Sequence, residues 1–292
     1  MRGRVVKQIH AYLLLLPALF FLFVFTHYPA LTTLIDSFMS TPKAGRSAVY
    51  VGMENYQIMI EDPVFWRSLS NNLWFAALTI PLSIGLSLMM ALWVNKKLAG
   101  QWFLRTSFFL PTILPMIAVA NIWIFFYTPG YGLFNQGLQT LGFAGQNWLG
   151  DPRFALGAVI VVAVWKQAGF FMIFYLAALQ SLSPSLREAA DIEGASSWYF
   201  FRRIQWPLLM PTTIFVLINA VIDAFRMVDH IIVMTHGGPD NASSVLLYFL
   251  YQIGFQFWDQ GYASALTVVL LMTLAVIGLI QFFTLDRRAH YQ

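Results

Sequence analysis

Long runs of apolar residues alternate with short polar segments along the whole chain. Six of these runs reach the roughly 20 residues that a helix needs to cross a bilayer core of about 30 Å. Their length, and the lack of alternating apolar and polar positions within them, favours helices over barrel strands. The predicted spans lie near Ala11–Leu34, Asn72–Val94, Thr106–Tyr127, Phe154–Leu179, Leu208–Asp229 and Tyr262–Leu285.

The composition leads to the same class. Apolar residues make up 59% of the 292 residues and charged residues only 10%, whereas soluble domains are about one quarter charged. The fold class is therefore an all-α polytopic membrane protein, predicted as a single transmembrane domain over residues 1–292. Basic residues are scattered at segment ends, which argues against a nucleic-acid partner. The absence of cysteine excludes disulfides, thiolate metal sites and a cysteine nucleophile.

The first apolar run has to be separated from a cleavable secretory signal. "MRGRVVKQIHAYLLLLPALFFLFVF" begins with basic residues and continues as a long apolar stretch. That stretch is longer than the apolar part of a usual signal peptide, and no small-x-small cleavage site follows it. We therefore expect an uncleaved signal anchor.

Lysine and arginine concentrate on one side of the predicted membrane. Eleven of them lie in the N-terminal segment, the 95–105 and 180–207 loops and the C-terminal segment, whereas five lie in the longer opposite loops. Because short cytoplasmic loops carry an excess of these residues, both termini are predicted to be cytoplasmic. The eleven are Arg2, Arg4, Lys7, Lys96, Lys97, Arg105, Arg187, Arg202, Arg203, Arg287 and Arg288; the five are Lys43, Arg46, Arg67, Arg153 and Arg226.

One predicted cytoplasmic loop is unlike the rest of the chain. "LREAADIEGASSWYFFRRIQWP", residues 186–207, holds three acids and three arginines around a single glycine. Ser183 and Pro184 predict a helix start, with Ser185 and Glu188 as a competing capping box, and this helix should run to about Glu193. Gly194 then turns the backbone. A second helix should begin at Ser196 or Ser197 and end before Pro207.

The loop has two physical interpretations. Ala189, Ala190 and Ala195 leave the turn with little side-chain bulk, so it is shaped like a knob that fits a groove on another protein. The alternative is an amphipathic helix lying on anionic lipid, with Arg202 and Arg203 at the headgroups. The acidic residues of the first arm would be repelled by such lipid, which favours a protein partner.

The same residues carry a family resemblance. "EAADIEGASSWYFFRRIQWP" resembles the EAA loop of ABC-importer permeases, with Glu188, Ala189, Ala190, Gly194, Ile204 and Pro207 in register. Further stretches resemble the sugar-type branch of that family, and they run from about residue 28 to the last span. Among them are "TPGYGLFNQGL", "VWKQAGFFMIFYLAALQSLSPSL" and "HGGPDNASSVLLYFLYQIGF". The chain departs from the pattern at Glu193, where the family often has aspartate, and at Trp206, where it usually has leucine.

The resemblance implies a fold, partners and a location. It implies the type I importer fold with six transmembrane helices in a bacterial inner membrane. The loop would be a coupling helix that seats in a cleft of a cytoplasmic ATPase through Glu188, Ala189, Ala190, Gly194 and Ala195, followed by Ile204 and Pro207. The implied partners are a second homologous permease, two ABC ATPase subunits that bind ATP and Mg, and an extracytoplasmic solute-binding protein.

The chain lacks motifs for supplying its own energy. A phosphate-binding loop needs a Gly-Lys pair, and none occurs; no H-E-x-x-H zinc motif occurs either. We therefore predict a chain that is not an enzyme and carries no cofactor, with ATP hydrolysed by a separate subunit. The alternative is an ion-coupled carrier or channel that acts without an ATPase. Such a protein would usually show acidic residues at mid-membrane, and the predicted spans have none there.

Polar residues within the spans are candidates for a substrate pathway, because they are costly in a membrane. Lys166 is either a substrate or gate contact, or a structural partner of carboxylates or carbonyls. Asn219, Asp223 and Arg226 share one helical face. Asp223 and Arg226 either pair with each other, which is the favoured alternative, or contact the solute directly, and Asn219 lies deeper and is the better pathway candidate. Asn121 either lines the pathway or makes an interhelical hydrogen bond. Trp123, Trp165 and Tyr175 are weighed as sugar-stacking or packing residues, and His236 is taken as a loop residue.

The solute itself stays open at this point. Lys166 and Arg226 suit an anionic solute such as glycerol 3-phosphate, and the family resemblance suits neutral sugars equally. The predicted function is thus the permease subunit of an ATP-driven importer for a sugar or sugar-like solute.

Overall fold

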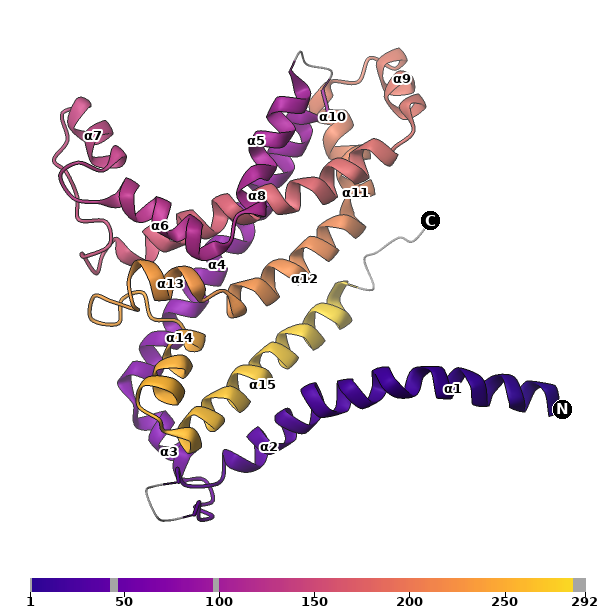
Figure 1. Ribbon diagram of the computed structural model, residues 1–292. Helices are drawn as coiled ribbons and strands as arrows, with labels where there is room; N and C mark the ends of the chain where they lie inside the picture. The colour runs from indigo at the N-terminus through magenta and orange to yellow at the C-terminus, as the bar shows by residue number, and fades with distance from the viewer. Residues whose placement is uncertain (1, 43–46, 97–99, 286–292) are drawn as a thin grey trace. The chain divides into compact units, whose positions relative to one another are not determined.

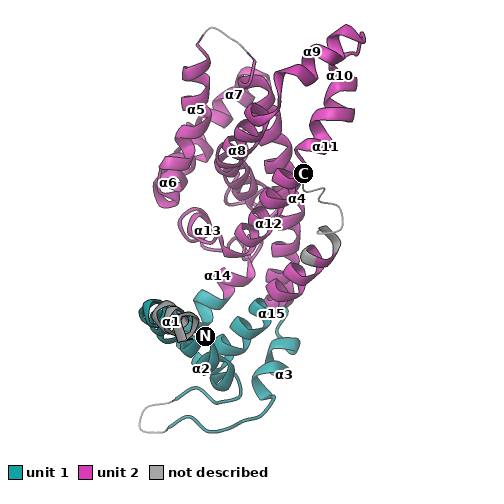
Figure 2. Cartoon of the chain, turned by 90° about the vertical axis from the view of Figure 1, so that its right-hand side faces the viewer, with its two compact units in different colours: residues 1–63, 250–272 teal, residues 64–249, 273–292 magenta. Residues whose placement is uncertain are grey.

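The protein is described by a computed structural model that covers residues 2–42, 47–96 and 100–285 (Figure 1). The described residues are helical apart from connecting loops and one isolated antiparallel bridge between Met39 and Tyr50. Lys43, Arg46, Lys97, Arg287 and Arg288, which entered the charge count, lie outside the described residues. The chain forms two compact units (Figure 2): residues 1–63 with 250–272, and residues 64–249 with 273–292.

Unit 1 contains the N-terminal helices and the loop after α2, which forms hydrogen bonds with Asp259 and Gly261. The loop after the first span is anchored by Asn55, whose side-chain amide donates to the carbonyls of Ser37 and Met39, each at 2.9 Å. The Thr41 hydroxyl donates to the Asp259 carboxylate and accepts from the N–H of Gly261 at 2.9 Å. The elements are α1 (Arg2–Leu22), η1 (Phe23–His27), α2 (Tyr28–Asp36), α3 (Glu54–Glu61), η3 (Gln252–Gln256) and the beginning of α15 (Gln260–Leu285).

Unit 2 is a helical bundle built around α8. The α5 and α12 helices both pack on α8, and α6 packs on α7 and α13. The helices are α4 (Pro63–Val94), α5 (Gln101–Ile113), α6 (Met116–Tyr127), α7 (Leu133–Thr140), α8 (Ala155–Ser181), α9 (Pro184–Ile192), α10 (Ser197–Phe200), α11 (Trp206–Leu208), α12 (Met210–Arg226), α13 (Asp229–Met234) and α14 (Leu246–Tyr251), with a π-helical turn η2 (Phe201–Gln205).

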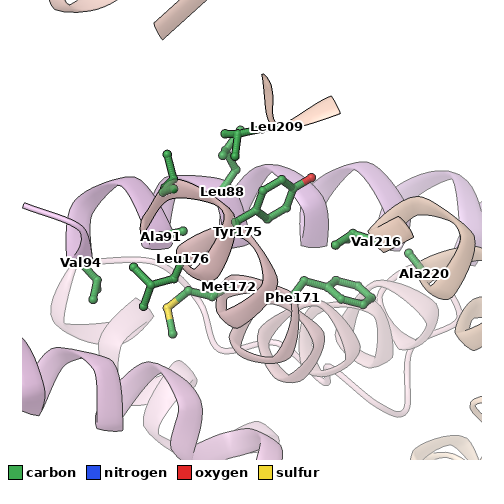
Figure 3. Close-up of a cluster of buried hydrophobic side chains, with 11 residues drawn as sticks. Leu88, Ala91, Val94, Phe171, Met172, Tyr175, Leu176, Leu209, Val216 and Ala220 are labelled. Carbon is green, nitrogen blue, oxygen red and sulfur yellow. The ribbon is translucent and has the colours of Figure 1, made fainter. Parts of the chain in front are cut away.

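Two apolar clusters hold this bundle together. The first joins α4, the C-terminal half of α8 and α12; Figure 3 shows Tyr175 and Phe171 of α8 between residues of the other two helices. The second joins α6, the N-terminal half of α8 and α13 through Trp123, Val162 and Met234. Because lipid is as apolar as these side chains, close packing rather than exclusion of water stabilises such contacts.

The structure has up to six candidate membrane spans, the predicted number, when each bent helix pair counts as one. Four helices are long and apolar enough to cross a bilayer, over Tyr12–Asp36, Pro63–Val94, Ala155–Ser181 and Gln260–Gln281. Two bent pairs complete the set: Gln101–Ile113 with Met116–Tyr127, bent by 105°, and Ser197–Leu208 with Met210–Met234, bent by 66°.

The third predicted span, Thr106–Tyr127, is divided into two helices at one of its prolines. The helix stops at Leu114, whose backbone is extended, and α6 begins after Pro115. A proline disfavours the helical conformation in the residue before it and removes a backbone donor, so the helix is interrupted there. The second span begins at Pro63, nine residues before the predicted Asn72, because the polar segment between these residues is helical as well.

Candidate functional site

The loop at 183–207 folds into the predicted elbow, defined here as α9, Gly194 and α10. Gly194 has a φ of +70°, which glycine adopts without strain. The N–H of Ala195 donates to the carbonyl of Ala190 at 2.9 Å, and the N–H of Gly194 donates to that of Asp191 at 3.1 Å. These two bonds form a Schellman motif, which ends α9 and fixes the turn.

The second arm begins where the sequence predicts. Ser196 precedes α10, and its hydroxyl accepts a hydrogen bond from the N–H of Tyr199 at 3.2 Å. At the start of the first arm, Ser183 occupies the N-cap position, but its hydroxyl contacts that of Ser185 at 2.8 Å rather than a backbone N–H. The capping box expected from Ser185 and Glu188 is therefore not what closes this end of α9.

The prediction that the second arm ends before Pro207 was wrong. The helical run continues from α10 through η2 and α11 to Leu208. In the π-helical turn the N–H of Trp206 donates to the carbonyl of Phe201, five residues back. This wider turn accommodates a proline that cannot donate to the helical ladder.

The residues expected to contact a partner lie around a small-residue surface. Glu188, Ala189 and Gly194 are exposed, Ala195 is half-buried, and Ala190 is buried with 7% of its surface accessible. A groove of about 790 Å³ runs along the inside of the elbow, and Ala189, Ala190, Gly194, Ala195 and Ile204 are among its lining residues. Of the predicted set, only Pro207 and Glu188 lie outside this lining.

Arg187 braces the elbow, a role that the sequence analysis missed. Its guanidinium forms an ion pair with Asp191 at 2.8 Å and lies over the ring of Phe200, 5.0 Å from the centroid. The first contact links successive turns of α9, and the second links α9 to α10. The i, i+4 spacing of Arg187 and Asp191 was a signal for the first contact, whereas the contact with Phe200 depends on the turn between the arms.

Lys166 lies at the break between α5 and α6. Its ammonium donates to the carbonyl of Pro111 at 3.0 Å and also to the carbonyl of Leu114. Of the alternatives weighed from the sequence, this is the structural one, with carbonyls as partners. Within the described part of the chain, Lys166 makes no ion pair.

Its neighbour Gln167 was not predicted to matter. It is buried, accepts a hydrogen bond from the Ser83 hydroxyl of α4 at 3.2 Å, and donates to the Met227 sulfur at 3.0 Å. The glutamine therefore joins three elements that are far apart in sequence. Its polar side chain within an apolar span was the available signal.

The remaining pathway candidates make local contacts. The Asn121 amide donates to the carbonyl of Ile117 at 2.9 Å, and the Asn219 amide donates to that of Phe215 at 2.7 Å, each within its own helix. Asp223 is half-buried and Arg226 exposed. Among the described residues, no ion pair within 4.0 Å joins these two, contrary to the expectation that they pair.

Two of the three aromatic candidates, Tyr175 and Trp123, are buried by packing. Tyr175 is fully buried, and its hydroxyl donates to Thr213 at 3.2 Å. Trp123 is buried among rings, with the centroid of Phe134 at 5.7 Å and that of Trp165 at 5.5 Å. Only Trp165 keeps a substantial exposed surface, so the packing alternative describes the other two.

The loop at 234–244 is fastened to the polar face of α4. The amide of Asn71 donates to the carbonyls of Asn241 and Ser244, both at 2.8 Å, and the Ser68 hydroxyl contacts that of Ser244 at 2.9 Å. His236, expected as a loop residue, is exposed there with a φ of +49°. In the described residues, no group of three or more His, Asp or Glu side chains could hold a metal ion.

Comparison with known proteins gives the family. Residues 83–291 match the family described as "Binding-protein-dependent transport system inner membrane component". The chain is 36% identical to the sulfoquinovosyl glycerol transport system permease protein SmoG of Agrobacterium fabrum, over 89% of this chain and 85% of that protein. It is 33% identical to the sn-glycerol-3-phosphate transport system permease protein UgpA of Brucella abortus biovar 1, over 98% and 97%.

Two further matches extend this result. The trehalose/maltose transport system permease protein MalF of Thermococcus litoralis is 36% identical over 92% of both chains. A crystal structure of a bacterial ABC transporter involved in the import of the acidic polysaccharide alginate contains a chain that superposes with a TM-score of 0.86 at 23% identity, covering 98% of each chain. That likeness gives the fold, and the sequence relatives give the family. The chain belongs to the family of binding-protein-dependent transport system inner membrane components and is the permease subunit of an ABC importer.

Proposed function

We propose that this permease moves a sugar or sugar-like solute into the cytoplasm and that an ATPase subunit drives it through the elbow. The observation that carries the proposal is the turn at Gly194, which presents Glu188 and Ala189 exposed beside a groove of about 790 Å³. Small exposed residues on a fixed turn allow a partner's surface to approach closely. The proposal takes residues 1–292 as one transmembrane domain.

The energy comes from outside the chain in this proposal. The sequence holds no Gly-Lys pair for a phosphate-binding loop. Two ABC ATPase subunits would bind ATP and Mg, one gripping this chain and the other a second homologous permease. Closure of the ATPase dimer on ATP draws the two elbows together, and hydrolysis resets the inward-facing state. Only the difference in ATP affinity between the two conformations drives this change.

The orientation follows from charge. The excess of lysine and arginine on the side of the elbow and the termini supports a cytoplasmic location for them. An extracytoplasmic solute-binding protein would then deliver the solute from the opposite side. A solved alginate transporter in complex with its periplasmic protein has a chain with a TM-score of 0.84 to this one, and it supports a partner of this kind.

The names of the relatives narrow the solute class. They transport a sulfoquinovosyl glycerol, glycerol 3-phosphate, and trehalose or maltose according to their names. These solutes share a polyol character, and two of them carry an anionic group. We propose that the polar face of Asn219, Asp223 and Arg226, together with Asn121, lies along the pathway of such a solute. Lys166 enters the proposal as a positioning group, because its ammonium donates to the carbonyls of Pro111 and Leu114.

The elbow is tested with Glu188→Arg in the transporter purified with its partners. We propose that Glu188 forms a salt bridge with a basic residue of the ATPase. The substitution places a cation at that position, so we expect solute-stimulated ATP hydrolysis to fall at least about tenfold, or the ATPase to be lost on purification. The matched control is Gln139→Arg, which adds the same cation at an exposed position of α7. If Glu188→Arg keeps both complex assembly and stimulated hydrolysis, the proposed contact is wrong.

The solute is tested on the cognate binding protein. A thermal-shift screen with neutral oligosaccharides, glycerol 3-phosphate and other polyols reports which class raises the unfolding midpoint, because a ligand that binds only the folded state stabilises it. A response to neutral oligosaccharides with none to phosphate esters would overturn the anionic alternative.

A further inference from the structure

Two membrane spans of unit 2 are interrupted, and their second halves pack against each other. The first interruption lies between α5 and α6 at Leu114–Pro115. The second lies between α12 and α13 at Met227–Val228, in a span whose 66° bend lies earlier, at Leu209. The α6 helix packs on α13, whereas α5 and α12 both pack on α8 (Figure 1). The interruptions therefore separate the α6 and α13 helices from the α5 and α12 helices.

The α8 helix runs through both groups. Its N-terminal half supplies Ala158 and Val162 to the second apolar cluster, with α6 and α13. Its C-terminal half supplies residues from Phe171 onward to the first cluster, with α4 and α12. Lys166 and Gln167 lie between these two sets. Polar groups at this depth are costly unless they are hydrogen-bonded, so their partners reveal their role.

Lys166 satisfies the carbonyls that the first interruption leaves free. Pro115 has no N–H, so the carbonyl of Pro111, four residues earlier, has no helical donor. The Lys166 ammonium donates to that carbonyl at 3.0 Å and to the carbonyl of Leu114. The last carbonyls of a helix also carry the negative end of its dipole, which stabilises a cation at this point. The lysine thus replaces the missing donor from another helix.

Gln167 makes the corresponding contact at the second interruption. Its amide donates to the sulfur of Met227, the first non-helical residue after α12, at 3.0 Å. Its carbonyl oxygen accepts from the Ser83 hydroxyl of α4 at 3.2 Å, so the amide orientation is fixed from the other side. Two adjacent residues of α8 therefore contact the two interruptions, which lie more than 100 residues apart in sequence.

We propose that Lys166 and Gln167 are positioning residues for transport: they hold both interruptions against α8 so that α6 and α13 keep one position relative to α5 and α12. The consequence for transport rests on the proposed function, whereas the contacts of Lys166 and Gln167 do not depend on it. The competing assignment gives Lys166 a direct contact with the solute. The two assignments differ in what happens when no solute is present.

The first test measures the bend between α5 and α6. The chain has no cysteine, so Phe103→Cys on α5 and Phe125→Cys on α6, both exposed, give one pair of spin labels. In the assembled transporter without ATP or solute, we expect a single narrow distance distribution. Lys166→Met should broaden or shift it, whereas Lys166→Arg, which still donates to two carbonyls, should retain it. Lys96→Met, at an exposed lysine two residues after the end of α4, is the control and should leave the distribution unchanged.

The second test separates positioning from solute contact. A positioning role predicts that Lys166→Met lowers the maximal rate of solute-stimulated ATP hydrolysis roughly tenfold, the scale of one charge-assisted hydrogen bond. The solute concentration for half-maximal stimulation should stay unchanged, and Lys166→Arg should restore much of the rate. Gln167→Leu, which removes the contacts to Ser83 and Met227, should give the same pattern.

The outcomes are distinguishable. An unchanged distance distribution in Lys166→Met, or an effect confined to the half-maximal solute concentration, would overturn the positioning role and favour solute contact. Loss of the ATPase partner from the wild-type complex would instead refute the proposed function. In that case the label measurement would be made on the purified permease and would still report on the bend, because it needs neither ATP nor solute.

Discussion

Replacing Gly169 by alanine provides a sharp test of the packing between α5 and α8. A Cβ atom at this position would lie 2.2 Å from the carbonyl oxygen of Phe108 and 3.4 Å from the Thr112 hydroxyl. The first distance is about 1 Å shorter than ordinary contact between carbon and oxygen, and the neighbour is backbone, so α5 has to move away from α8. Small residues allow helices in membranes to approach this closely.

The expected magnitude is the balance of two effects. Alanine favours helix by about 0.8–1.0 kcal/mol over glycine, while overpacking of a tight contact costs about 1–3 kcal/mol or more. Gly157→Ala on the same helix is the matched control, because nothing lies within 4 Å of its added Cβ. It gains the helix preference without the clash. The two variants should therefore differ by about 1–3 kcal/mol, with Gly169→Ala the less stable.

The assay is thermal unfolding of the detergent-purified chain, followed by intrinsic fluorescence of its ten tryptophans. At roughly 2–4 °C per kcal/mol for a chain of this size, the midpoints of the two variants should differ by about 2–12 °C, with the lower value for Gly169→Ala. Equal midpoints would refute the close approach of α5 to α8, and with it the geometry that lets Lys166 reach the α5–α6 break.

Three further predictions concern polar side chains elsewhere. Asn135→Ala removes an amide oxygen that accepts hydrogen bonds from the N–H of Gln146 at 2.9 Å and from the Trp148 indole at 3.0 Å. The thermal unfolding midpoint should fall by an amount corresponding to about 1–3 kcal/mol. An unchanged midpoint would contradict this prediction. Asn72→Ala removes a fully buried acceptor of a backbone N–H in α14, at 3.3 Å, and should also cost about 1–3 kcal/mol in thermal unfolding. Hydrogen bonds from Arg153 lower the pKa of Asp151 from 3.8 to about 2, so its contribution to stability is present above pH 3.8 and is lost as the pH falls through 2. Asp151→Asn should therefore shift the midpoint by the same amount at every pH between 5 and 8, and a shift that changes within that range would refute the assignment.

The elbow could be predicted from sequence because its signals are local. Glycine adopts a left-handed conformation at no steric cost, so Gly194 indicates a turn. Ser196 begins a helix by accepting a hydrogen bond from the backbone N–H three residues ahead. Both depend on neighbours in the chain. Pro207 could not be predicted in this way. A proline usually ends a helix, but here a π-helical turn accommodates it, and no residue pattern in the sequence predicts that turn.

The interior contacts could not be predicted in the same way. Lys166 stood out in the sequence, and its two alternatives could not be resolved, because the deciding carbonyls belong to residues more than 50 positions away. Asp223 and Arg226 share a helical face, which was grounds for expecting an ion pair. A shared face brings the backbones near each other but leaves the side-chain directions undetermined, and these two do not meet among the described contacts.

The elbow and the interruptions are connected through α8, which gives the proposed coupling a physical route. The helix ends at Ser181 and continues through two extended residues, Leu182 and Ser183, into α9. The Tyr175 hydroxyl of α8 donates a hydrogen bond to Thr213 of α12, so a force on the elbow would move α8 and α12 together. Lys166 and Gln167 of α8 then contact the two interruptions, at Leu114 before α6 and at Met227 before α13.

We propose that the coupling between the ATPases and the pathway follows this route, and label distances test it. It predicts that closure of the ATPases changes the distance between labels introduced by Phe103→Cys and Phe125→Cys in the wild-type background, and that Lys166→Met weakens this change while the ATPases still close. The reasoning requires both results, because a joint that transmits motion has to be stiff as well as connected. An equal ATP-dependent change in Lys166→Met would show that the elbow acts on the pathway without this joint.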